Sequence, residues 1–207
     1  MFAWFSASSC ADVFFYDLET TGLNQYHDKI IEYTFLNQKG DNITSLVNPY
    51  KNKTYLPLNQ KLKILTKISD DMIKDSPKFG ELLPSIIDFL GNSDSKYLVS
   101  HNNDIFDKIF LKNILKKQKY DINKLNLKFI DTLLLSKKLI PDLKSYSLKN
   151  VCTHLKIPFK STHRTLEDTK MVAKLYKKLL EKLSENENVK IDDLVNNPEL
   201  VYNYLYN

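Results

Sequence analysis

Two carboxylates at the end of an apolar stretch are the first residues of this sequence whose type and spacing can support chemistry. The stretch VFFYDLETTG covers residues 13–22, and its apolar half runs into Asp17 and Glu19. Residues two apart on a β-strand share a face, so both acids are expected on the side of Val13 and Phe15. Neighbouring like charges repel when buried, and a divalent cation that prefers oxygen ligands would compensate them. The alternative is a strand that has reached water, with both acids opening a solvated turn.

A third acid falls on the apolar side of a predicted helix. Asp107 lies at the start of a helix predicted over 106–117, on the same side as Phe110 and Leu111. An acid in this place either binds something or compensates the helix dipole, and both interpretations stay open. Asp104 precedes the apolar periodicity, so we predict that it caps the helix.

A histidine and a fourth acid occur together late in the chain. Asp168 lies three residues before Met171 and four before Val172, on the buried stripe of a helix predicted over 169–183. His163 is five residues earlier, and an imidazole can take up a proton near neutral pH. A single histidine is more often structural than catalytic, so its pairing with an acid carries the interpretation. Four carboxylates can hold two divalent ions ~4 Å apart, an arrangement that supports in-line attack on a phosphodiester.

Three stretches resemble the exonuclease motifs of the DEDDh, or DnaQ-like, 3′→5′ exonucleases in order and approximate spacing. They are DLETTG (17–22), HNNDIFDKIFL (101–111) and HRTLED (163–168). This family includes the proofreading subunit of bacterial DNA polymerase III, ribonuclease T, oligoribonuclease and the TREX-type DNA exonucleases. The similarity covers roughly residues 12–183, and three ordered motifs are far more specific than one.

The resemblance implies a role for each of the acids and for the histidine. Asp17 would bridge two Mg²⁺ or Mn²⁺ ions. Glu19 and Asp168 would complete the site of the ion that activates water, and Asp107 would hold the second ion. His163 would act as the general base. Residues expected to border the terminal nucleotide or the substrate strand, with packing and turn formation as the alternative, are Leu18, Thr20, Thr21, His101 and Asn102.

One residue departs from the family pattern. The third motif usually has an alanine two residues after the histidine, and this chain has Thr165 there. The threonine adds a hydroxyl and volume beside the general base, so it is expected to tilt His163 or to hydrogen-bond near it. All four metal-binding acids are present, so catalytic activity is still expected.

The remaining pattern predicts the elements that must position these residues. Strands are predicted over 13–18, 30–36, 43–47, 97–100 and 127–130, helices over 79–90, 106–117, 132–139, 147–155 and 169–183, and helical turns over 59–66 and 69–73. Early strands followed by alternating helices indicate an α/β structure. The resemblance implies the ribonuclease H-like layered fold, a five-stranded mixed sheet with the first strand central and helices on both faces.

The chain is expected to hold one exonuclease domain over residues 1–183, followed by a polar extension over 184–207. The extension either packs on the domain, contacts a partner or is disordered. The first ten residues, MFAWFSASSC, lack a basic leader and are expected to be a frayed terminus or an edge segment.

Composition favours a soluble, intracellular protein of the cytoplasm or nucleus, or a viral protein in its host cell. No apolar run of the 207 residues approaches the ~20 needed to cross a bilayer, so no membrane partner is expected. Cys10 and Cys152 lie far apart, which favours reduced thiols. The net charge of +5 suits a nucleic-acid partner, although lysine-rich segments such as 112–119 and 137–149 are equally typical of solvated helix faces.

Three functions follow from these observations. The first is a DNA 3′→5′ exonuclease that removes 5′-mononucleotides from single-stranded or frayed ends in proofreading, repair or end trimming. The second acts on RNA 3′ ends, as an exoribonuclease or oligoribonuclease. The third keeps the nuclease fold as a nucleic-acid-binding module without turnover. A polymerase or another replication or repair protein, and a second copy of the chain, are the expected protein partners.

Overall fold

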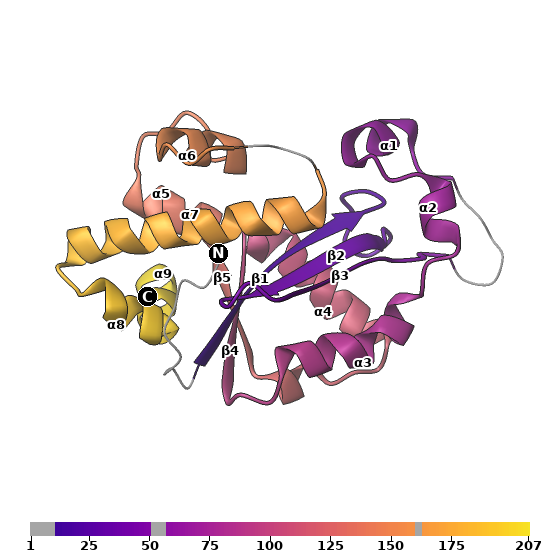
Figure 1. The fold of residues 1–207 in the computed structure, drawn as a ribbon, viewed down its shortest axis with the longest axis horizontal. Helices are drawn as coiled ribbons and strands as arrows, with labels where there is room; N and C mark the ends of the chain where they lie inside the picture. Colours follow the sequence, from indigo (N-terminus) through magenta and orange to yellow (C-terminus); the bar gives the residue numbers. More distant parts are fainter. Residues whose placement is uncertain (1–10, 51–56, 160–162) are drawn as a thin grey trace.

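A five-stranded mixed sheet with helices on both faces forms the body of the molecule (Figure 1). The computed structural model describes residues 11–50, 57–159 and 163–207. The strands lie in the order β3-β2-β1-β4-β5 and span β1 Ala11–Thr20, β2 Ile30–Asn37, β3 Asn42–Leu46, β4 Ser95–Ser100 and β5 Leu127–Asp131. β1 pairs antiparallel with β2 and parallel with β4, so both pairing modes meet at the central strand. The predicted sheet, with its first strand central, is confirmed.

The helices before residue 188 occur where the apolar periodicity predicts them, with ends that shift by a few residues, whereas the two helices after it were not predicted. They are α1 Gln60–Thr66, α2 Asp70–Lys74, α3 Phe79–Leu90, α4 Asp107–Lys117, α5 Thr132–Leu139, α6 Leu148–His154, α7 Thr165–Glu187, α8 Ile191–Asn196 and α9 Pro198–Tyr206, with short 3₁₀ turns η1 Asn103–Ile105 and η2 Ile122–Leu125. Among the described residues, no helix combines the length and the apolar composition that a bilayer crossing requires.

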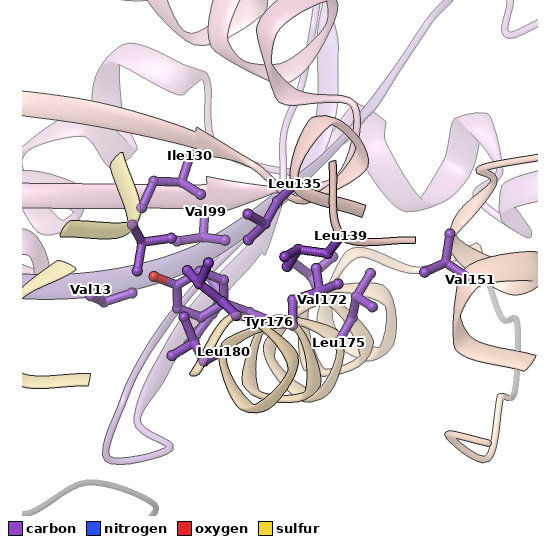
Figure 2. Packing of buried hydrophobic residues seen from close by; sticks show 14 of the residues in the cluster. Val13, Val99, Ile130, Leu135, Leu139, Val151, Val172, Leu175, Tyr176 and Leu180 are labelled. Atoms are coloured by element: carbon purple, nitrogen blue, oxygen red, sulfur yellow. The ribbon is translucent and has the colours of Figure 1, made fainter. Parts of the chain in front are cut away.

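The central strand is apolar on both faces because helices cover both. Phe14 and Tyr16 point into a core cluster with α3 and α4, whereas Val13 and Phe15 join the cluster under α5, α6 and α7. Figure 2 shows Val13 of β1 facing Tyr176 of α7 in this second cluster. Alternation along the strand therefore continues to Asp17 and Glu19 on the α7 face.

Helix α7 is longer than the sequence pattern predicts. It begins at Thr165 rather than Thr169 and ends at Glu187, where Asn188 adopts the left-handed conformation that often terminates helices. The earlier start places Asp168 in the first turn, above the end of β1. Burial of nine side chains along the helix fixes its long axis across the sheet.

Residues 184–207 continue α7 and then form α8 and α9, which pack back on the domain (Figure 1). Leu194, Val201 and Leu205 are buried in the α7 cluster. Glu199 accepts hydrogen bonds from the Tyr97 hydroxyl and from the Lys128 ammonium group. The predicted terminal segment 1–10, with Cys10, lies outside the described residues, and Cys152 is buried and free.

Candidate active site

Three carboxylates meet where β1 ends below the first turn of α7. Asp17, Glu19 and Asp168 each place one oxygen within 4.8 Å of the others. The strand supplies the first two acids on one face, and the helix crosses that face with the third. The prediction that the two β1 acids share a face with Val13 and Phe15 is confirmed, because all four side chains lie on the face that α7 covers.

Burial and mutual repulsion make these carboxylates hold their protons. Burial raises the pKa of Asp17 well above its usual range, and the charges of Asp107 and Glu19 raise it further. The pKa of Glu19 is raised to about 8, and that of Asp168 to about 6, in both cases chiefly by burial. A cluster of this kind could hold a divalent cation in place of protons, because the cation would supply the missing positive charge.

Asp107 lies outside this group of three acids, on a helix that packs on the other face of the sheet, although its charge still raises the pKa of Asp17. It is the first residue of α4, is only 3% exposed, and accepts a 2.7 Å hydrogen bond at Oδ2 from the Ser100 hydroxyl. Burial raises its pKa to about 7, although the Ser100 bond lowers it in part. Its Oδ1 is buried and makes no hydrogen bond of normal geometry among the described residues, although the backbone N–H of Leu18 is close enough to lower the pKa of Asp107. A buried acceptor left open beside Asp17 fits the donor set of a hard cation.

The turn that delivers Asp107 is built on a buried aspartate that the sequence pattern did not single out. Asp131 accepts the backbone N–H of Asn102 at 2.9 Å and that of Asp104 at 3.0 Å. Asn102 is left-handed, with a φ of 67°. The predicted capping role of Asp104 is wrong, because a 3₁₀ turn intervenes and Phe106 occupies the N-cap position; Asp104 pairs with Lys108 instead.

Both ring nitrogens of His101 form hydrogen bonds within the protein. Its Nδ1 lies 3.0 Å from the Thr132 hydroxyl, and its Nε2 lies 2.8 Å from the carbonyl oxygen of Tyr146. Burial lowers its pKa, so the neutral ring is favoured. The imidazole thereby connects the end of β4 to the segment that follows α5.

The predicted nucleotide-binding residues after Asp17 lie at the end of β1 and in the turn that follows it. Leu18 is buried in the cluster with α3 and α4. The hydroxyl of Thr20 donates to the carbonyl of Gly22 at 2.6 Å, and that of Thr21 donates to Asp28 at 2.8 Å. A Cβ at position 22 would come within 2.5 Å of the Asp28 carboxylate, so a larger residue there would displace that side chain. These side chains shape the turn after β1.

His163 is exposed and lies near Asp168. Its φ of 47° is left-handed, which is uncommon for a residue with a side chain. Its imidazole makes no hydrogen bond to any residue of the part of the chain that is described, whereas its charge lowers the pKa of Asp168. The ring is therefore near the acids and open to solvent.

An ion pair beside the cluster was missed by the sequence reasoning. Glu32 on β2 lies opposite Glu19 in the strand register and accepts two hydrogen bonds from Arg164 Nε, at 2.9 and 3.1 Å, and one from Arg164 Nη2 at 2.5 Å. It also accepts the backbone N–H of Thr165 at 3.0 Å. The available signal was an acid inside the apolar run IIEYTF, the same signal that singled out Asp17.

The hydroxyl of Thr165 is engaged with β2. It lies 2.8 Å from the hydroxyl of Thr34, which in turn lies 2.7 Å from that of Thr44. Thr165 is fully buried. The added hydroxyl therefore ties α7 to the sheet, and the expected hydrogen bond near His163 is replaced by one to β2.

Comparison with known proteins identifies the family. Residues 14–176 match the RNase_T family model, which is described as an exonuclease. The chain is 34% identical over 170 residues to the PolC-type DNA polymerase III of Caldanaerobacter subterraneus subsp. tengcongensis, and 33% identical over 174 residues to that of Bacillus subtilis. These matches cover 82% of this chain but only 12% and 11% of the two polymerases.

Solved structures agree on the fold. An exonuclease I structure superposes with a TM-score of 0.70 at 18% identity, over 83% of this chain and 41% of that chain. The nuclease domain of 3′hExo, a DEDDh family member bound to rAMP, gives a TM-score of 0.68 at 19% identity, over 82% and 92%. With three ordered motifs, a shared fold and a matching family model, this chain belongs to the RNase_T exonucleases, of the DEDDh type and with the ribonuclease H-like fold.

Proposed function

We propose that this chain is a 3′→5′ exonuclease that hydrolyses single-stranded or frayed DNA ends and releases 5′-mononucleotides. The observation that carries the proposal is the convergence of Asp17, Glu19 and Asp168 within 4.8 Å, with Asp107 near enough for its charge to act on Asp17. Support for DNA as substrate comes from the PolC-type DNA polymerases to which most of the chain is similar. Exonuclease I, which shares the fold, has been solved with a dA16 oligonucleotide.

Asp17, Glu19, Asp107 and Asp168 would hold two Mg²⁺ or Mn²⁺ ions. When bound, such ions stabilise negative charge on a phosphodiester and lower the pKa of a bound water. His163, exposed and without a hydrogen-bond partner in the described part of the chain, would accept the proton of the attacking water at a ring nitrogen. The turn after β1 and the 101–104 turn would border the terminal nucleotide, through Leu18, Thr20, Thr21, His101 and Asn102.

RNA 3′ ends are the second candidate substrate. The observation that favours RNA is the 3′hExo nuclease domain, which was solved with rAMP and is covered over 92% of its length. The complete set of acids weighs against a binding module without turnover. The chain spans 12% of its PolC-type relative, and its similarity to a DNA polymerase supports the polymerase partner that we propose, with the catalytic unit in residues 1–183 and the helical extension in 184–207.

The test is digestion of 5′-labelled single-stranded DNA and RNA of one sequence with Mg²⁺, Mn²⁺ or EDTA. We expect a metal-dependent ladder that shortens from the 3′ end and a rate that falls by about 10³-fold or more in Asp17→Ala. Asp192→Ala, which removes an exposed acid of α8, serves as the matched control and keeps the wild-type rate. The nucleic acid that is digested faster, DNA or RNA, is the preferred substrate. Binding of the strand without any shortened product would refute the proposed nuclease activity.

A further inference from the structure

We propose that Glu32 is a positioning residue for the third motif and not a metal ligand. Its carboxylate holds the start of α7 so that His163 and Asp168 face the acids of β1. This inference rests on the proposed function, because it assigns Glu32 a part in the same reaction. It is drawn from the contacts of Glu32, Arg164 and Thr165.

Every oxygen of Glu32 already has a partner. The side chain is only 4% exposed and lies opposite Glu19 in the strand register, so it faces the same side of the sheet. A buried carboxylate is costly unless it is paired, and the guanidinium of Arg164 pairs with both oxygens. Asp107, by contrast, keeps an oxygen open. The carboxylate of Glu32 therefore binds the start of α7 with both oxygens, whereas Asp107 keeps one oxygen that a cation could bind.

The same carboxylate caps helix α7. Arg164 occupies the N-cap position but makes no capping hydrogen bond with its own side chain. Glu32 instead accepts the N–H of Thr165, the first helical residue, at 3.0 Å. The carbonyl of Arg164 accepts the N–H groups of Glu167 and Asp168, both at 3.1 Å. One acid from β2 thus fixes the backbone from which Asp168 projects.

His163 depends on this anchor because its own conformation is disfavoured. A left-handed φ of 47° persists only where neighbouring contacts hold it. Within the described part of the chain its imidazole has no hydrogen bond, so the residue next to it, Arg164, supplies the anchor through Glu32. A second tie, the 2.8 Å contact between the Thr34 and Thr165 hydroxyls, holds the helix to the sheet when Glu32 is altered.

The experiment is a double-mutant cycle between Glu32→Gln and His163→Ala. In the Mg²⁺-dependent digestion we expect Glu32→Gln to lower kcat about 10–100-fold with KM nearly unchanged, as misplacement of a reacting group does. In the His163→Ala background the same change should lower kcat by a clearly smaller factor, because the part of the loss that comes from a misplaced His163 is already gone and only the part through Asp168 remains. Glu181→Gln, which breaks an exposed ion pair with Lys178 on the same helix, is the matched control and keeps wild-type kcat.

Two measurements that need no turnover complete the test. The number of Mn²⁺ ions bound, from isothermal titration calorimetry, should be the same in Glu32→Gln and wild type. The amides of Thr165 and Asp168 should exchange faster with deuterium in the variant. If Glu32→Gln does not fold, Arg164→Lys keeps the charge but removes the two-pronged pair, and it should show the same loss of kcat.

Wild-type kcat in Glu32→Gln, fully additive effects in the cycle, or loss of a bound Mn²⁺ ion would each overturn the inference. An inactive wild type that binds Mn²⁺ would refute the proposed exonuclease instead. In that case unchanged amide exchange at Thr165 and Asp168 would refute the positioning role, and faster exchange would uphold it. The two failures are therefore distinguishable.

Discussion

At the residue scale, the buried acids keep their protons at a pH where free carboxylates have lost them. The pKa of Glu19 is raised to about 8, that of Asp107 to about 7 and that of Asp168 to about 6, chiefly by burial. Without metal, the folded chain therefore binds more protons than the unfolded chain above pH ~4. The stability contributed by these groups is fully present below that pH and is lost as pH rises through the folded values.

This linkage predicts a pH dependence for the metal-free protein. In urea unfolding with EDTA, the free energy of unfolding should fall between pH 5.5 and 8.5. Asp107→Asn removes one titrating acid, so the variant should be more stable than wild type by about 1–3 kcal/mol at pH 8 and should show a shallower slope. Adding Mg²⁺ should stabilise the wild type more than the variant. Equal slopes in the two proteins would contradict the linkage.

At the element scale, one aspartate organises the second motif. Asp131 accepts backbone N–H groups from Asn102, Asp104 and Leu133, which ties the 101–104 turn to the start of α5. Three hydrogen bonds to a single buried carboxylate hold the turn, and α4 begins three residues after it with Asp107 as its first residue. The position of Asp107, a proposed metal ligand, therefore depends on a residue that has no proposed contact with metal.

Asp131→Ala should leave the turn's amides without acceptors. We expect the free energy of unfolding in urea to fall by about 2–4 kcal/mol, because each buried group left unpaired is costly. Asp121→Ala is the control, since Asp121 caps the exposed turn η2 with a single bond to Asn123 and should cost about 1 kcal/mol. Similar losses in the free energy of unfolding of both variants would show that Asp131 stabilises the protein no more than an exposed capping residue does.

Local patterns predicted the elements well but missed contacts between distant ones. Alternation along β1 was enough to place Asp17 and Glu19 on one face, and helical spacing was enough to place Asp168 near the start of α7. The capping role expected of Asp104 was wrong because a tight turn, set by Asp131, separates it from the helix. The pairing of Glu32 with Arg164 spans 132 residues, and no local pattern can contain it.

At the scale of the whole molecule, the extension is part of the core. Val201 is fully buried in the α7 cluster, whereas Leu200 on the same helix is 40% exposed. The ring of Tyr202 packs edge-on against that of Tyr97 on β4, and the Tyr206 hydroxyl donates to Asp104 at 2.9 Å. Helix α9 thus connects strand β4 to the turn of the second motif.

The pair Val201→Ala and Leu200→Ala tests this packing. We expect Val201→Ala to lower the free energy of unfolding by about 2 kcal/mol, because it removes two buried carbons and leaves a cavity. Leu200→Ala should change it by less than about 0.5 kcal/mol, as exposed substitutions do. Thermal or urea unfolding of the two variants measures both values. Neutral behaviour of Val201→Ala would mean that α9 does not stabilise the domain.

The distance along the chain between the halves of the site sets an order of events during synthesis. Glu32 and Arg164 are separated by 132 residues, and Thr34 and Thr165 by 131. At ~5–20 residues per second, roughly 7–26 seconds pass between the translation of the two halves. During that interval the growing chain carries the acids of β1 but neither His163 nor Asp168. If His163 and Asp168 have the proposed catalytic roles, an unfinished chain cannot yet cut the nucleic acids around the ribosome that makes it.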